Sequence, residues 1–337
     1  MAYLDRFTIG DLVTDCHIYE GDGTRPIKEE NVQIIYEPDR RVELPPEVAR
    51  WRAEIEAREA GLRAAGQPYR WNNPRFALER IIVGRTSEDE EPVVQLHLSN
   101  ADYYDFLAVT TNLDRPLDAS GVTLRSLHLE SDDPIDAPGF MSCSFGVNVA
   151  VETGPDRKMI ISRRSSMVAG ANALRWNSSA NEGLARIHDL PEDGSPISLH
   201  RVARRALKEE LAVQAGDDVS LELLAFALDL RNHQWAAYFR AVLTELTEAQ
   251  LRARWSKGIE DKWEHERYAF VPATPDDVLE FILSQPPEEW TPCAPSLFYL
   301  ALVRGAVLAR GGDPDGRLDV EAAERRALQR VRGVGAA

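Results

Sequence analysis

The chain has 337 residues, of which 39 are Lys or Arg and 55 are Asp or Glu, so its formal net charge is −16. This length predicts about two domains, and it is long enough to bury a full core without disulfides. The excess of acidic residues disfavours a nucleic-acid partner, because contact with a phosphate backbone requires clustered Lys and Arg.

Cysteine usage and charge placement bear on the compartment. Cys16, Cys143 and Cys293 are far apart and form no Cys-x-x-Cys pair, so neither a disulfide framework nor a cysteine zinc site is expected. Charged residues occur early in the chain, which is not the pattern of a signal peptide. The uncharged stretch 291–303 is far shorter than the ~20 residues of a membrane span. We therefore expect a cytoplasmic protein with no membrane partner.

The first third of the chain predicts a mixture of strands and one long helix. Short strands are expected at 11–19 and 31–37, where apolar and β-branched residues lie between turn-forming segments. A helix is expected to begin after Pro45, because proline suits the first turn, and to end at Gly61 or Gly66.

The next segment predicts two more strands, at 71–84 and 92–99, followed by a short helix. Asn100 is the predicted N-cap of that helix. A further strand-like run lies at 122–130. We place a domain boundary near 134–139, so that residues 1–135 form a smaller α+β N-terminal domain.

From residue 140 the predicted order is strand, strand, long loop, helix, strand, strand, helix, strand, helix. This order is typical of an α/β domain with a mixed sheet and helices on both faces. It gives a second domain over residues 136–312. Residues 313–337 are mostly Arg, Ala, Gly and Asp, and we expect them to be a solvated C-terminal tail.

The predicted amphipathic helix that starts at residue 199 contains RALKEELAV at 205–213. This segment resembles the second half of the Nudix box, Gly-x5-Glu-x7-Arg-Glu-U-x-Glu-Glu-x-Gly-U, where U is aliphatic. The resemblance implies an α/β/α sandwich that hydrolyses diphosphate bonds with Mg²⁺ or Mn²⁺ held by the box glutamates. A metal suits that chemistry because it neutralises the charge that develops on an anionic diphosphate, and carboxylate oxygens suit the metal.

The match to the box is partial. Arg205 stands at the position of the family's structural Arg, and Glu209 and Glu210 stand at those of its paired acids. Ala206 replaces the central Glu, and Ala212 replaces the Gly that follows the helix. The Gly and the Glu of the first half have no counterpart. In isolation, the Arg and Glu side chains also fit an ordinary solvated helix face.

Neighbouring acids are candidates for the missing ones, and the upstream loop holds two of them, Glu182 and Asp189. Glu182 lies in an Asn-Glu-Gly segment where some Nudix branches carry an acid, so Glu182, Glu209 and Glu210 are the predicted metal ligands. Asp261 and Glu264 lie where several members place a general base on a loop. The alternatives are a turn acid for Glu182 and a solvated charged run for the other two.

Four further residues are predicted to bind substrate. Arg163 and Arg164 resemble the arginine-bearing strand end of the family and would contact phosphate. Trp71 and Tyr103 would stack on a nucleobase, with an ordinary core position as the alternative. The segments around these residues are loosely similar to the Nudix branch of UDP-sugar diphosphatases.

Two functions follow from the resemblance. The first is a metal-dependent diphosphohydrolase acting on a nucleoside diphosphate derivative such as a nucleotide-sugar, with Glu209, Glu210 and either Glu264 or Asp261 in catalysis. The second is a Nudix-like module that binds a nucleotide-derived small molecule and acts through a protein partner, because Ala206 removes the central acid. A scaffold without a ligand is a third reading. The family resemblance also implies a homodimer.

Overall fold

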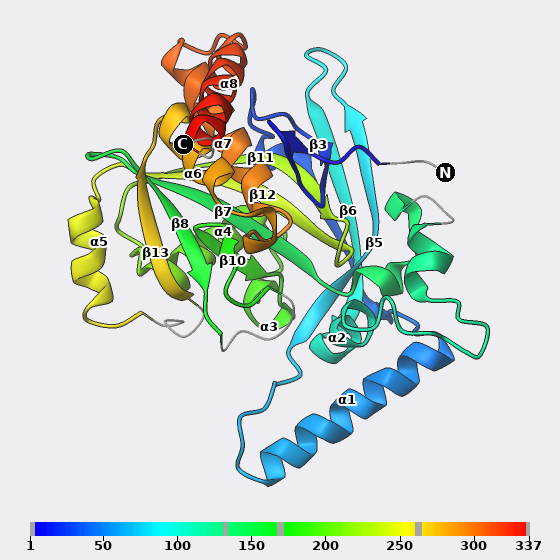
Figure 1. Ribbon diagram of the computed structural model, residues 1–337. Helices are drawn as coiled ribbons and strands as arrows, with labels where there is room; N and C mark the ends of the chain where they lie inside the picture. Colours follow the sequence, from blue (N-terminus) through cyan, green and yellow to red (C-terminus); the bar gives the residue numbers. More distant parts are fainter. Residues whose placement is uncertain (1–3, 131–133, 167–171, 260–264, 335–337) are drawn as a thin grey trace.

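A mixed sheet forms the centre of the computed structural model, which describes residues 4–130, 134–166, 172–259 and 265–334 (Figure 1). Its main path runs β13-β8-β7-β12-β11-β3, and the short strands β9 and β10 pair with β8 and β7. The pair β7–β12 is parallel, and its neighbours along the path are antiparallel. The strands are β3 (Cys16–Glu20), β7 (Phe145–Thr153), β8 (Lys158–Arg164), β9 (Trp176–Asn177), β10 (Ala180–Gly183), β11 (Val219–Asp229), β12 (Gln234–Leu243) and β13 (His265–Pro272).

Helices cover both faces of this sheet. Along β7, Val147, Val149 and Val151 pack in one core with the box helix α4 (Leu199–Leu211), whereas Ala150 packs in a second core with α7 (Ala294–Ala309). The alternation follows from the two-residue period of a strand. The predicted fold class, a mixed sheet between helical layers, is confirmed. Helices α3 (Arg186–Asp189), α5 (Glu248–Trp255) and α6 (Pro275–Ser284) complete this part of the chain. In the described part of the chain, no helix is long and apolar enough to cross a membrane.

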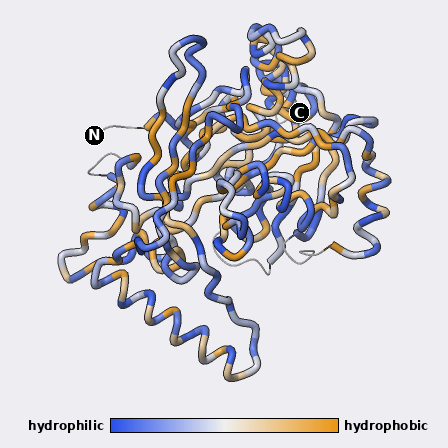
Figure 2. The backbone as a smooth tube through the Cα atoms, turned by 180° about the vertical axis from the view of Figure 1, so that it is seen from behind, coloured by the Kyte–Doolittle hydropathy of each residue, from blue (hydrophilic) through white to orange (hydrophobic). Residues whose placement is uncertain are grey.

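A second sheet of three strands, β4-β6-β5, precedes the central sheet in the sequence. Its elements are β4 (Val32–Arg41), β5 (Pro74–Arg85), β6 (Pro92–Asp102), α1 (Pro46–Ala64) and α2 (Tyr103–Thr110). Phe76 and Leu96 of this sheet share one buried core with Leu207 of α4 and Phe145 of β7. The apolar segments of both sheets meet in the interior, while the outer loops are hydrophilic (Figure 2). Residues on both sides of position 135 therefore share one core.

The start of the chain also joins the central sheet. A small hairpin of β1 (Thr8–Ile9) and β2 (Leu12–Val13) leads into β3, which pairs antiparallel with β11. The predicted strands at 11–19 and 31–37 are thus present, but the first of them belongs to the central sheet. The predicted strand at 122–130 is wrong: residues Arg125–Leu129 form a helical turn. The Arg125 guanidinium holds this turn by donating to Asp114 and to the Arg231 carbonyl.

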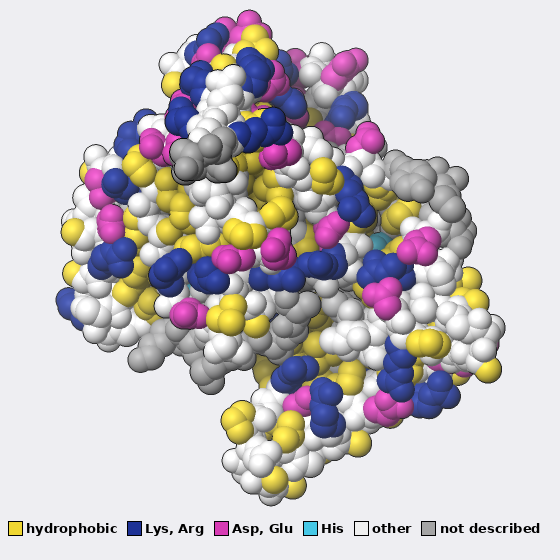
Figure 3. All heavy atoms as spheres, in the orientation of Figure 1, with side chains coloured by type: hydrophobic (Ala, Val, Ile, Leu, Met, Phe, Trp, Pro, Cys, Tyr) yellow, Lys and Arg dark blue, Asp and Glu magenta, His cyan; other side chains and the backbone are white. Residues whose placement is uncertain are grey.

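The expected C-terminal tail is instead a helix, α8 (Gly316–Val334), packed on α6 and α7. Its buried side chains are small, namely Val320, Ala323 and Ala327, which is why the segment looked polar as a sequence. Arg326 and Arg330 both pair with Asp276 of α6. Basic and acidic side chains accordingly lie side by side over this helix at the top of Figure 3.

Replacement of a buried residue of α8 tests this packing. Ala327→Asp places an unpaired carboxylate between α8 and its neighbours, so we expect a loss of about 2–4 kcal/mol in the free energy of unfolding. Gln329→Asp, two residues further along at an exposed position, is the matched control and should change stability little. Urea denaturation of both variants measures the difference. Equal stability of the two would mean that the segment is a tail.

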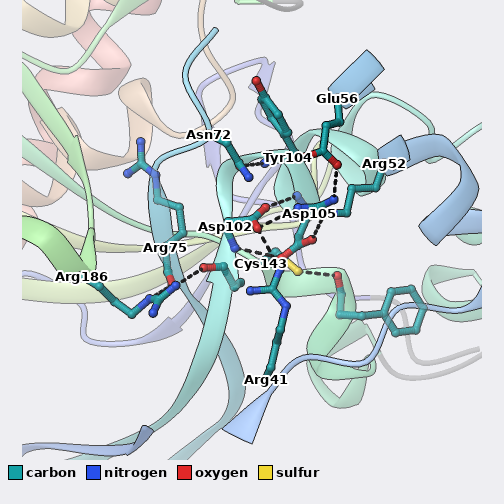
Figure 4. A network of polar contacts seen from close by, with 12 residues as sticks. Arg41, Arg52, Glu56, Asn72, Arg75, Asp102, Tyr104, Asp105, Cys143 and Arg186 are labelled. Carbon is teal, nitrogen blue, oxygen red and sulfur yellow. Dashed lines mark hydrogen bonds and ion pairs between the residues drawn. The ribbon is translucent and has the colours of Figure 1, made fainter. Parts of the chain in front are cut away.

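The N-terminus of α2 is fixed by a network of carboxylates and guanidinium groups (Figure 4). Asp102 accepts a hydrogen bond from the Asp105 amide, and Asp105 accepts one from the Asp102 amide, which is a reciprocal capping arrangement. Arg41 and Arg52 each pair with both carboxylates. The cap is therefore Asp102 and not Asn100 as predicted, because β6 continues for two more residues.

The box helix ends at Ala212, which has the left-handed backbone conformation φ 56°, ψ 32°. A residue with a Cβ pays for this conformation in steric strain, which glycine avoids. The Nudix pattern that the sequence resembles has Gly at this position, a residue that adopts this conformation without strain.

Ala212→Gly should therefore stabilise the protein. Relief of the strain outweighs the larger chain entropy of glycine, and we expect a gain of about 0.5–1 kcal/mol in the free energy of unfolding. Ala215→Gly is the control, because Ala215 is exposed and its φ is not positive; it should be neutral or slightly destabilising. A destabilised Ala212→Gly protein would contradict the strained conformation.

Candidate functional site

Arg205 lies at the centre of a cluster of carboxylates. Its Nη1 is 3.0 Å from Glu182 Oε2 and 3.4 Å from Glu209 Oε2, and its Nη2 is 2.8 Å from Asp189 Oδ2. Nη2 also donates to the carbonyl of Gly183. Burial by itself lowers the pKa of Arg205, but the nearby carboxylates of Glu182 and Asp189 outweigh it, and the pKa is raised. The guanidinium is thus a permanent cation surrounded by three carboxylates, which we call the Arg205 cluster.

Three elements bring this cluster together. Arg205 and Glu209 lie one turn apart on α4, where residues four positions apart are neighbours. Glu182 comes from β10, which pairs with β7 and passes close to α4. Asp189 ends the short helix α3 and also accepts a hydrogen bond from the Ala185 amide. The positions of Glu182 and Asp189 therefore depend on strand pairing as well as on the helix.

Glu210 has a different environment from Glu209. It is buried, its Oε2 lies 2.5 Å from Nε2 of His265 on β13, and its Oε1 accepts the Asn181 amide at 2.9 Å. Successive residues on a helix point about 100° apart, so one acid of the pair faces Arg205 and the other faces the sheet. Glu210 thus connects α4 to β10 and β13.

The three predicted metal ligands, Glu182, Glu209 and Glu210, have different partners in the structure. The first two are paired with Arg205, and Glu210 is engaged by His265. Ala206, at the place of the family's central Glu, is fully buried in the apolar core. Across the described ranges, no group of three or more His, Cys, Asp or Glu side chains is arranged to hold a metal ion. Asp261 and Glu264, the predicted bases, lie outside these ranges.

A polar cavity of about 110 Å³ lies beside the Arg205 cluster. Glu182 and Gly183 belong to its wall, and Arg164 and Asp229 contribute further charged side chains. Five lining residues carry side-chain amides: Asn148, Asn172, Asn177, Asn181 and Gln234. They come from β7, β9, β10, β12 and the segment before β9. Amides both donate and accept hydrogen bonds, so this wall is suited to a polar ligand.

Several of these lining groups have buried polar atoms that make no hydrogen bond within the described part of the chain. Among the described residues, no hydrogen bond is made by the buried atoms Arg164 Nε, Asn172 Oδ1, Asn177 Nδ2 and Asn181 Nδ2. Asn177 is only 6% exposed. A buried polar atom left unpaired costs about 1–3 kcal/mol, and most such atoms in proteins have partners. Their concentration at one cavity indicates a site whose hydrogen-bonding partner is a ligand.

The four predicted substrate-binding residues are not brought together. Arg164 lines the cavity, but Arg163 pairs with Glu289 at 3.1 Å and lies over the Trp176 ring. Tyr103 stacks on Phe106, with ring centroids 6.0 Å apart. Trp71 is 57% exposed and is not part of the cavity wall.

Sequence reasoning missed the amides. Asn177 and Asn181 lie in the same segment as Glu182, yet asparagine in a loop ordinarily indicates a turn. Here both residues belong to short strands that pair with β8 and β7, and the pairing places them at the cavity. The only signal in the sequence was the unusual density of Asn between residues 172 and 181.

Asp229, at the end of β11, is the buried acid of the cavity wall. Burial raises its pKa from 3.8 to about 6, against hydrogen bonds from Asn232 and the Arg231 amide that favour the charged form. Protonated Asp229 therefore stabilises the fold at low pH, and this contribution is lost as the pH rises from about 4 through about 6. His233 has the opposite trend, because burial lowers its pKa to about 4.

The difference in unfolding free energy between the wild type and Asp229→Asn isolates the effect of Asp229. As the pH rises from about 4 to about 7, we expect the free energy of unfolding of the wild type to fall by up to roughly 3 kcal/mol relative to that of Asp229→Asn. Urea denaturation of both proteins at several pH values measures it. A difference that stays constant with pH would show that Asp229 titrates normally.

Comparisons with known proteins concern the fold. No family model matches the chain, and no curated protein matches it. The NUDIX domain of Shewanella oneidensis NrtR complexed with ADP ribose is similar at 16% identity and TM-score 0.30, over 47% of this chain and 84% of that chain. A C. elegans Ap4A hydrolase binary complex is similar at 11% identity and TM-score 0.30, over 50% of this chain and 98% of that chain. A Nudix domain is thus among the solved structures that this chain resembles.

Proposed function

We propose that this protein is a Nudix-like module that binds a nucleotide-derived ligand and does not hydrolyse it through a box-bound metal. The observation that carries the proposal is the set of unpartnered polar atoms at the cavity beside Glu182 and Gly183. A buried site of this kind is costly to the free protein and gains its hydrogen bonds when a ligand binds.

The chemistry of the wall favours a ligand rich in oxygen acceptors. Three of the unpartnered atoms, on Arg164, Asn177 and Asn181, are donors, and one, on Asn172, is an acceptor. Phosphate oxygens, sugar hydroxyls and the carbonyls of a nucleobase all accept such hydrogen bonds. A cavity of about 110 Å³ has room for one ring or one phosphate group. A ligand larger than one such group would place one end in the cavity and extend beyond it.

The Arg205 cluster argues against metal-dependent hydrolysis. A divalent cation at Glu182 and Glu209 would have to displace a guanidinium that already neutralises them and is itself a positive charge. The buried position of Ala206 leaves no room for the family's central ligand without disturbing the core. In this proposal, helix α4 keeps a structural role, and its acid Glu209 helps to hold Arg205 in place.

Isothermal titration with ADP-ribose and with UDP-glucose, in Mg²⁺ and in EDTA, tests this function. We expect saturable binding of at least one of them that EDTA leaves unchanged, and no release of nucleoside monophosphate. Asn177→Ala should weaken binding about tenfold, the effect of roughly 1.4 kcal/mol. Asn112→Ala is the control, because Asn112 follows α2 and is not part of the cavity wall, and this variant should bind like the wild type.

Two outcomes would overturn the proposal. Turnover that requires Mg²⁺ or Mn²⁺ and is lost in Glu209→Gln would establish the metal-dependent diphosphohydrolase predicted from the box. Failure of the folded wild-type protein to bind any nucleotide derivative would favour the scaffold without a ligand.

A further inference from the structure

Arg75 reaches the edge of this site from the other sheet. It lies on β5, where its backbone bridges to Ala185 just after β10. The Arg186 guanidinium fixes this junction by donating to the carbonyls of Arg75 and Ala101, each at 3.1 Å. The backbone of Arg75 is therefore held at the place where the three-stranded sheet meets the cavity wall.

The guanidinium of Arg75 lies directly against Gly183. A Cβ at position 183 would be 1.9 Å from Arg75 Nη1, so no residue with a side chain could stand there without moving the arginine. Cζ of Arg75 is also 5.6 Å from the centroid of the Tyr103 ring. Since Gly183 is part of the cavity wall, one glycine separates this cation from the amide-lined cavity.

Arg75 lacks the partners that neighbouring arginines have. Arg41 and Arg52 are paired with Asp102 and Asp105, and Figure 4 shows the Arg75 side chain leaving β5 away from these carboxylates. Within the described ranges, Arg75 Nε has no hydrogen-bond partner and the guanidinium makes no ion pair within 4.0 Å. Burial lowers the pKa of Arg75, and the Glu182 charge offsets this only in part. A guanidinium nevertheless stays charged, so the free protein carries the cost of an uncompensated cation.

We propose that Arg75 binds a phosphate group of the ligand whose other end occupies the cavity. The inference rests on the proposed function, because it assigns a second contact to the same ligand. A guanidinium matches the oxygens of a phosphate with two parallel hydrogen bonds, and the missing charge partner would be supplied by the anion. The nearby Arg205 cannot take this role, because three carboxylates already neutralise it. The three-stranded sheet would thereby complete the binding site.

Thermal denaturation of Arg75→Met with and without inorganic pyrophosphate tests this assignment. Met keeps most of the apolar stem but removes the unpaired charge, so without the anion the variant should melt at the same temperature as the wild type or higher. Pyrophosphate, compared with NaCl at equal ionic strength, should raise the melting temperature of the wild type and not that of the variant. Arg80→Met, exposed on the same strand, is the control and should keep the wild-type response.

These expected melting temperatures differ from those for an arginine that only supports the fold. If Arg75 only supported the fold, Arg75→Met would melt at a lower temperature, and pyrophosphate would raise its melting temperature as much as that of the wild type. Either an equal pyrophosphate shift in both proteins or no shift in the wild type would overturn the inference.

Nucleotide titration separates this inference from the proposed function. We expect Arg75→Met to bind ADP-ribose or UDP-glucose about tenfold more weakly than the wild type does. Equal nucleotide affinity would reject Arg75 as a contact while leaving the proposed function intact. If the wild type bound no nucleotide but pyrophosphate still acted through Arg75, the proposed function would fail, and the site would be one for free phosphate.

Discussion

The ion cluster around Arg205 joins the elements on which the rest of the site depends. Its guanidinium connects α4 to β10 through Glu182 and to α3 through Asp189, and it holds Glu209 one turn along the helix. Without this cation, three carboxylates would lie close together in a partly buried place and repel one another. In the proposed function, the interaction that stabilises the strand and the helix also keeps those acids from holding a metal.

The ion pairs around Arg205 also help to determine the shape of the neighbouring cavity. Because β10 is held between β7 and α4, Asn181 and Glu182 are fixed in the cavity wall, and Gly183 follows at its edge. The buried pair of Glu210 and His265 ties the same strand region to β13. On the far side of Gly183, Arg75 belongs to a sheet that shares its core with α4. Under the proposal for Arg75, both parts of the chain contribute residues to one binding site.

The sequence was most informative where the pattern of buried residues follows from a single helix or strand. The helical period of 199–213 and the apolar runs of β7 and β8 predicted those elements, because their burial follows a local repeat. Prediction of elements from the sequence failed where a contact between residues far apart in the chain determines the local structure. The polar α8 is held by Asp276. Asp102 replaces Asn100 as the cap because the pairing of β6 with β5 continues to Asp102. For the site, Arg205 and the nearby acids Glu182 and Asp189 were recognised in the sequence. Their ion pairs and the positions of the amides depend on strand pairing and were not predicted.

Titration of Mn²⁺ into the wild type and into Arg205→Gln most directly tests whether the Arg205 guanidinium takes the place of a metal ion. With Arg205 in place, the wild type should show no saturable uptake of Mn²⁺ in the calorimeter. Arg205→Gln should gain a site, because Glu182, Asp189 and Glu209 lose their counter-ion and oxygen ligands suit the metal. Binding of one equivalent of Mn²⁺ by the wild type, abolished by Glu209→Gln, would contradict the role assigned to Arg205.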